Sequence, residues 1–178
     1  MDRYETTYAY RGSRWIKRIV VAADGSPAST RGLKEVADLA PRVGANVVVV
    51  FVRHVPATAL MAPSVAGGVV AQTLDEQEAE VRQEVLRLLG GTGVSWELVV
   101  RAGSPGEEIL QVADETGADL VVVGSNRHSS LHNLILGSTA AYLAAHSQAP
   151  VLVMRSKEAR APVHGGQLET SISSRSRS

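Results

Sequence analysis

Cysteine is absent from this 178-residue sequence, which excludes disulfide bonds, thiolate metal sites and cysteine nucleophiles. Long apolar runs are also missing, because none reaches the roughly 18–20 residues that a membrane-spanning helix needs. Residues 1–7 (MDRYETT) lack the apolar core of a secretory signal. We therefore expect a cytoplasmic protein that does not enter the membrane.

The chain has no net charge, but its charges are unevenly distributed. Residues 1–18 and 155–178 each carry five basic and two acidic groups, so each end has a net charge of +3. The segment between them, residues 19–154, has a net charge of −6. Because an acidic domain binds a phosphodiester backbone poorly, we do not expect nucleic acid to be a partner.

Short apolar runs alternate with helical patterns along the chain. The runs predict strands at residues 16–23, 46–52, 95–100, 120–123 and 150–154, and the patterns predict helices at residues 27–41, 69–89, 105–116 and 140–147. This alternation indicates a doubly wound α/β domain over residues 16–155, with a five-stranded parallel sheet sandwiched by four helices. The strand order 3-2-1-4-5 is taken from the fold class and not from the spacing. We expect residues 1–15 to be a flexible leader and residues 156–178 to be a disordered Ser/Arg tail.

Polar residues follow the first and fourth predicted strands. Asp24 follows the first strand, and Gly124 opens a loop that leads from the fourth strand to Gly137, Ser138 and Thr139. With the order 3-2-1-4-5, both strand ends flank the crevice in which open parallel sheets bind ligands. Gly124 would turn the backbone sharply off its strand, and Gly137 would let the backbone approach a ligand closely.

The residue types around this crevice suit a phosphate-bearing ligand. Ser138 and Thr139 would place hydroxyls beside the free N–H groups at a helix start, which attract anions. Asp24 could accept from a ribose hydroxyl or hold a divalent cation. Each residue also has an ordinary structural explanation, since Asp-Gly is a common turn and Ser138 is a suitable helix cap.

Three segments resemble a universal stress protein domain, over nearly all of residues 15–155. They are RIVVAADGSPAS, the Gly-Ser-Pro of residues 103–105, and ADLVVVGSNRHSSLHNLILGSTAAYLAAHSQAPVLVMR. The family signature is glycine, two residues, glycine, nine residues, glycine, then serine or threonine. Gly124, Gly137 and Ser138 match it, whereas Arg127 stands at the second glycine.

The resemblance implies a function and a site. Family members with the full signature resemble ATP-binding proteins, and members without it often do not bind ATP. By resemblance, ATP would bind here, with or without Mg²⁺. Asp24 would lie at the ribose or metal, and the backbone of Val52 would line the adenine pocket. The residues around ribose and phosphates would be Gly124, Asn126, Gly137, Ser138 and Thr139.

The resemblance also implies a homodimer that forms through the fifth strand. In this chain the pairing would involve residues 151–154 of that strand, from Val151 to Met154.

Arg127 leaves two readings of the crevice open. If the backbone there needs a positive φ, arginine is strained by about 1 kcal/mol and the loop reshapes. If the backbone is ordinary, arginine adds a bidentate phosphate donor, unless it is only a solvated loop residue. The function we predict is a universal-stress-type regulatory protein that binds ATP at the ends of strands 1 and 4. The alternative is a dimeric interaction scaffold of the same fold that does not bind nucleotide.

Catalysis and metal binding have little support in the sequence. No general base is evident beyond Asp24, so slow ATP hydrolysis is the most that we expect of the chain as an enzyme. His128 and His132 have the i,i+4 spacing of a metal pair, and His54 follows the second strand, but no third ligand is evident. We therefore predict no metal site formed by protein ligands alone.

Overall fold

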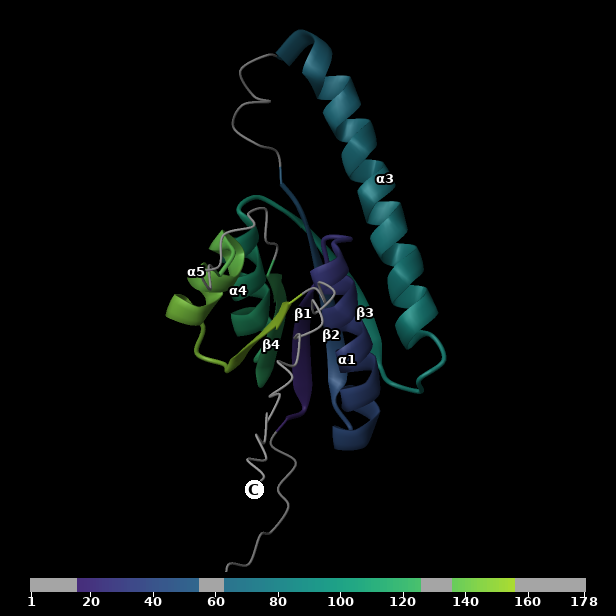
Figure 1. The fold of residues 1–178 in the computed structure, drawn as a ribbon, viewed down its shortest axis with the longest axis vertical. Helices are drawn as coiled ribbons and strands as arrows, with labels where there is room; N and C mark the ends of the chain where they lie inside the picture. Colours follow the sequence, from purple (N-terminus) through teal and green to yellow (C-terminus); the bar gives the residue numbers. More distant parts are fainter. Residues whose placement is uncertain (1–15, 55–62, 126–135, 156–178) are drawn as a thin grey trace, which may run out of the picture.

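A computed structural model describes residues 16–54, 63–125 and 136–155, without the side chains of residues 63–70 (Figure 1). Strands and helices alternate through these residues. They are β1 (Arg18–Ala22), α1 (Pro27–Val43), β2 (Asn46–Arg53), α3 (Pro63–Leu89), β3 (Trp96–Ala102), α4 (Pro105–Thr116), β4 (Leu120–Ser125), α5 (Ser138–His146) and β5 (Val151–Arg155). The predicted leader and tail lie outside the described residues. No helix in the described part of the chain is long and apolar enough to cross a membrane.

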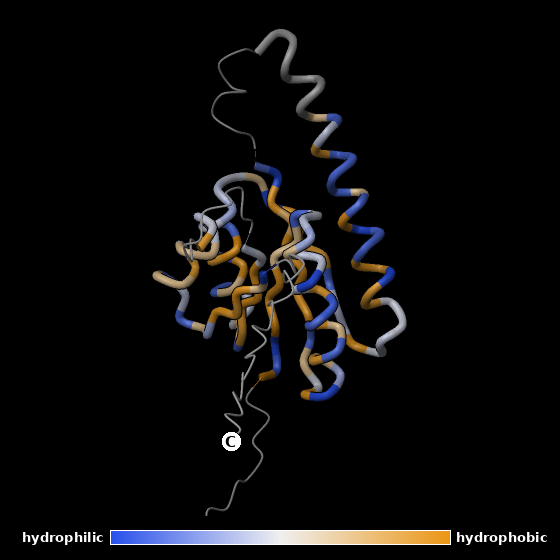
Figure 2. Tube along the Cα trace, in the orientation of Figure 1, coloured by the Kyte–Doolittle hydropathy of each residue, from blue (hydrophilic) through white to orange (hydrophobic). Residues whose placement is uncertain are grey.

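The five strands form one parallel sheet with the order β3-β2-β1-β4-β5, which confirms the predicted topology. The central strand β1 pairs on both sides, with Ile19 opposite Val47 of β2 and Leu120 of β4. Figure 2 shows the hydrophobic residues concentrated in these inner strands. Such unbroken apolar runs are typical of strands that helices cover on both faces.

Two apolar clusters lie on opposite faces of the sheet. On one face, α1 and the C-terminal half of α3 pack through Leu33, Val81 and Val85. On the other face, α4 and α5 pack through Ile109 and Leu143. Side chains of β1 and β2 alternate between the two clusters, as the period of two in a strand requires.

The turn after β1 is built as its residue types predict. Ser26 caps α1 by accepting a hydrogen bond from the backbone N–H of Ser29 at 3.2 Å, and Pro27 occupies the first helical position. Gly44 ends the helix with φ +68°, a conformation that glycine adopts without steric cost. These local features direct the end of β1 into a helix that returns along the sheet.

The start of α3 differs from the prediction. The sequence pattern predicts a helix from residue 69, but α3 already begins at Pro63, in a segment rich in proline, alanine and glycine. Proline is tolerated in the first turn of a helix, and each internal glycine costs only about 1 kcal/mol relative to alanine. Figure 1 shows that the N-terminal part of α3 extends past the end of the sheet.

Candidate functional site

A cleft of about 840 Å³ lies at the carboxyl ends of β1, β2 and β4. Its walls also include the first turns of α4 and α5 and part of α3. Six of the eight residues predicted for the site line it: Asp24, Val52, Gly124, Gly137, Ser138 and Thr139. The other two, Asn126 and Arg127, lie outside the described residues. The structure therefore brings together residues that are more than one hundred positions apart in the sequence.

Asp24 is held at the exposed rim of the cleft by the turn that leads into α1. Its Oδ1 accepts a hydrogen bond from the backbone N–H of Ser26 at 2.9 Å, and Gly25 between them has φ +78°. The buried hydroxyl of Ser29 donates to the carbonyl of Ser26 at 3.0 Å and lies 3.3 Å from the backbone nitrogen of Asp24. This network fixes the direction in which the carboxylate leaves the chain.

Gly124 has a different role from the one predicted. It lies inside β4, where it pairs with Met154 of β5, and it is not among the residues with positive φ, so the expected sharp turn at this position is wrong. A Cβ atom there would lie 2.8 Å from the backbone nitrogen of Ser29 and 3.0 Å from the carbonyl carbon of Ala28. Glycine is needed because the end of β4 packs directly against the first turn of α1.

Gly137, Ser138 and Thr139 form the start of α5. Gly137 is the cap residue and has no side chain with which to bond the helix, so the suggestion that Ser138 is the cap is wrong. Ser138 is the first helical residue and is exposed, and the first turn contains no acidic residue. The positive end of the α5 dipole therefore faces the cleft with neither a side-chain cap nor a carboxylate from its own first turn.

The start of α4 reaches the same cleft through Ser104, Pro105 and Gly106. It has no side-chain cap bond either, but its first turn carries Glu107 and Glu108. These carboxylates offset the positive end of the α4 dipole. Of these two helix starts, α5 is thus the more favourable place for an anion.

The inner part of the cleft is mainly apolar. Its side chains come from the ends of β2 and β4 and from two helices: Val50, Phe51, Val52, Val123, Leu74 and Ile109. Tyr142 of α5 closes one side, with its ring against Gly106, where a Cβ atom would lie 2.8 Å from the ring. His146 stacks on Tyr142 at a centroid distance of 4.2 Å. A planar ring would fit this part of the cleft, and an anion would fit the polar part at α5.

Two residues after the predicted adenine contact, His54 lines the opening of the cleft. Its Nδ1 lies 3.0 Å from the carbonyl oxygen of Gly103. Because a carbonyl only accepts, Nδ1 carries the proton in this bond. The bond links the ends of β2 and β3 at the opening.

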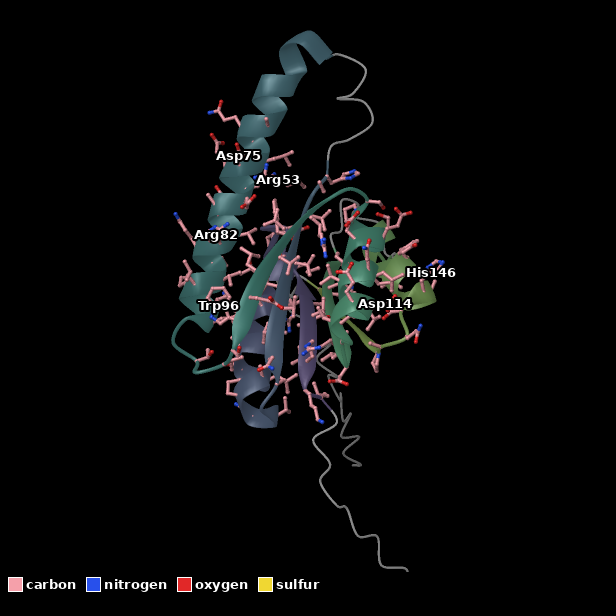
Figure 3. The ribbon with its side chains drawn as sticks, turned by 180° about the vertical axis from the view of Figure 1, so that it is seen from behind. Arg53, Asp75, Arg82, Trp96, Asp114 and His146 are labelled. Atoms are coloured by element: carbon pink, nitrogen blue, oxygen red, sulfur yellow. The ribbon has the colours of Figure 1, made fainter. Side chains whose placement is uncertain are left out.

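Arg53 connects the end of β2 to α3 on the outer side of the cleft (Figure 3). Its guanidinium donates to Glu78 at 2.9 Å through Nε and lies 2.8 Å from Asp75 through Nη2. The hydrogen bond from Arg53 holds the pKa of Glu78 below its ordinary value, with a smaller contribution from Arg82. These ion pairs keep α3 against the strand whose end contributes Val52.

Sequence reasoning missed the part of the site that comes from α3, from the start of α4 and from Tyr142 of α5. The missed lining residues include Leu74, Gln77, Ser104, Pro105, Gly106 and Tyr142. The Gly-Ser-Pro of residues 103–105 was a usable signal, because it precedes a helix at a strand end. Nothing in the sequence indicated which side of α3 faces the cleft.

No group of three or more histidine, aspartate or glutamate side chains that could hold a metal ion occurs within residues 16–54, 71–125 and 136–155. His128 and His132 lie outside these ranges.

Comparison with known proteins gives a consistent result. The model of the universal stress protein family matches residues 16–155. Universal stress protein YxiE of Bacillus subtilis is 33% identical over 148 residues, which cover 78% of this chain and 98% of that protein.

Solved structures extend the comparison. A universal stress protein in complex with cAMP aligns with a TM-score of 0.60 at 24% identity, covering 79% of this chain and 98% of the other. The universal stress protein from Archaeoglobus fulgidus in complex with dAMP aligns with a TM-score of 0.57 at 23% identity, covering 78% and 97%. At these identities the two structures show a shared fold.

Proposed function

The chain belongs to the universal stress protein family, and from this premise we propose that it is a regulatory protein that binds an adenine nucleotide, ATP, at the ends of β1 and β4. The observation that carries the proposal is that six predicted site residues line one cleft. At this cleft α5 begins without a side-chain cap bond and without an acidic residue in its first turn. The volume of about 840 Å³ lies in the range of small-molecule sites. The cAMP and dAMP complexes of two proteins with this fold add support.

The two parts of the cleft suggest how ATP would lie. The adenine would enter the apolar part, where the backbone of Val52 borders it. The phosphates would lie at the start of α5, near Gly137, Ser138 and Thr139, because its N–H groups and dipole favour negative charge.

The remaining proposed contacts come from the ends of β1 and β4. Asp24 would accept from a ribose hydroxyl or hold Mg²⁺ if the metal accompanies the nucleotide. Asn126 would contact the ribose or phosphates, and Arg127 would donate to the phosphates. Gly124 would contribute backbone at the same place.

We further propose that the protein is cytoplasmic and forms a homodimer through β5. That strand is the last in the sheet order, and Leu152 on it is 42% exposed. Binding of ATP would then act by changing the order of the loop before α5 or the dimer contacts. Hydrolysis, if present, would be slow and would depend on Asp24.

The test is calorimetric titration of nucleotide-free protein with ATP, with and without Mg²⁺. We expect wild-type binding and at least a tenfold loss of affinity in Gly137→Val, because the new side chain fills the site at the start of α5. The matched control is Gly91→Val, since a Cβ atom at Gly91 meets nothing within 4 Å.

Arg127→Gly distinguishes the two candidate functions. A further loss of affinity in this variant would make Arg127 a phosphate ligand. Absence of wild-type binding, restored by Arg127→Gly, would mean that arginine closes the site and would favour the interaction scaffold. Absence of binding in both proteins would overturn the nucleotide proposal altogether.

A further inference from the structure

The strand β3 forms the edge of the sheet opposite β5. One side of β3 pairs with β2 over seven residues, and its other side has no strand neighbour among the residues that the structure describes. In Figure 3, β3 runs across the front of the molecule, with α3 on one side and α4 on the other. Such an edge presents backbone N–H and C=O groups that another strand can pair with.

The side chains of β3 alternate between the two faces of the sheet. Trp96 and Leu98 pack in the cluster with α1 and α3, so Val100 lies on the same face, where it is 36% exposed. Val99 packs in the cluster with α4 and α5. By the same alternation, Glu97 and Arg101 lie on the α4 face.

These residues make β3 complementary to itself. In an antiparallel pair of two copies centred on Val99, Glu97 of each copy lies opposite Arg101 of the other, which gives two such pairs. Leu98 then lies opposite Val100 on the other face. Opposite charges and apolar side chains directly across an antiparallel pair are both stabilising.

The charge match is specific to this register. Moving the centre to Leu98 would place Glu97 against Val99 and Arg101 against Ser95. A shift to Val100 would place Arg101 against Val99. Only the register centred on Val99 satisfies both charges, as an isologous two-fold interface requires.

Arg101 can accommodate a second carboxylate. It pairs with Glu115 of α4 through Nη2 at 2.6 Å, yet its side chain is 36% exposed. A guanidinium has five N–H donors, and one carboxylate uses only part of them. Glu97 is exposed and has no ion pair within the described part of the chain.

The edge at β5 lacks this feature. An antiparallel pair centred on Val153 would place Arg155 opposite Val151, and no acidic residue lies on that strand. The two edges of the sheet are therefore different surfaces, one apolar and one with paired charges.

We propose that β3 is a self-association surface, on which a second copy of this chain adds its own β3 in antiparallel orientation centred on Val99. This surface is distinct from the proposed homodimer at β5. If both edges pair, each copy contacts two others, so the assembly is larger than a dimer.

The first test uses charge reversal and analytical ultracentrifugation of the full chain carrying Leu152→Arg, which puts a charge on the β5 edge. In that background, Glu97→Arg and Arg101→Glu should each weaken self-association at least tenfold, because each opposes like charges twice across the axis. A mixture of these two variants should associate again, since every cross pair is then of opposite charge. Gln83→Arg, an exposed change on α3, is the control and should leave association unchanged.

The second test uses the absence of native cysteine. Val99→Cys should form an intermolecular disulfide under mild oxidation, because Val99 faces itself across the axis, whereas Gln83→Cys should not. Leu152→Cys reports the β5 edge separately, so failure of one interface does not hide the other. The proposal is overturned if the Leu152→Arg protein is monomeric, if Glu97→Arg associates as before, or if the mixture of charge variants fails to associate.

Discussion

The helices α4 and α5 begin at the same cleft but differ in the charge of their first turns. The first turn of α4 contains Glu107 and Glu108, whereas that of α5 contains no acidic residue and has Ser138 and Thr139 instead. Neither helix start has a side-chain cap bond. The difference between them is therefore mainly one of charge.

This difference shows how one fold can assign separate roles to similar elements. Carboxylates in the first turn stabilise a helix by about 0.3–1 kcal/mol each because they offset its dipole. At the start of a helix without such carboxylates, an anionic ligand can make the same favourable interaction with the dipole. In α4 this interaction is made by Glu107 and Glu108, and in α5 the proposed nucleotide would make it.

The largest effect that we expect comes from Gly124→Ala, which disturbs the strand that precedes α5. The new Cβ atom would lie within 3.0 Å of backbone atoms of Ser29 and Ala28, and backbone cannot rotate away as a side chain can. Overpacking of this kind costs about 1–3 kcal/mol of unfolding free energy. Denaturant unfolding measures the loss, and ATP affinity should fall with it because the α1 turn that carries Asp24 is displaced.

Gly91→Ala is the matched control, since its Cβ atom would meet nothing within 4 Å. If Gly124→Ala unfolds at the same denaturant concentration as this control, the close packing of β4 on α1 does not constrain the site.

Gly124 also shows where sequence reasoning succeeded and where it stopped. The position was identified because glycine follows an apolar run, a pattern that indicates either a turn or a close approach of backbone. Choosing between them requires the position of Ser29, which is 95 residues earlier in the chain. The sequence carries no local information about that contact.

The same limit separates the predicted residues from the missed ones. Strand order and strand ends followed from apolar runs and a known fold class, so Asp24 and Gly137 could be placed at one crevice. Leu74 and Gln77 could not, because periodicity predicts a helix but not which of its sides faces a ligand. Contacts between elements, such as the hydrogen bond from Arg53 to Glu78, decide which side of α3 faces the cleft.

An intermediate effect should follow from Ser138→Glu, which gives α5 the kind of first turn that α4 has. ATP affinity should fall about tenfold, because the carboxylate occupies the positive helix end and repels the phosphates. The stability of the protein should stay constant or rise by up to about 1 kcal/mol, because the same carboxylate favours the helix. Calorimetry and thermal unfolding of one preparation give both values.

Ala145→Glu, an exposed position at the other end of α5, adds the same charge away from the cleft and is the control. Equal losses of affinity in both variants would mean that net charge, and not the start of α5, determines binding.

The smallest effect concerns α4. Glu107→Gln removes one exposed carboxylate from its first turn and should tighten ATP binding about two- to threefold, because a like charge near the phosphates is lost. Asp114→Asn removes the same charge from the far end of the helix and should change affinity less. The difference between these variants should disappear in about 1 M salt, where screening acts within about 3 Å. A gain that is equal in the two variants, or that persists at high salt, would contradict a local role for the charge at the start of α4.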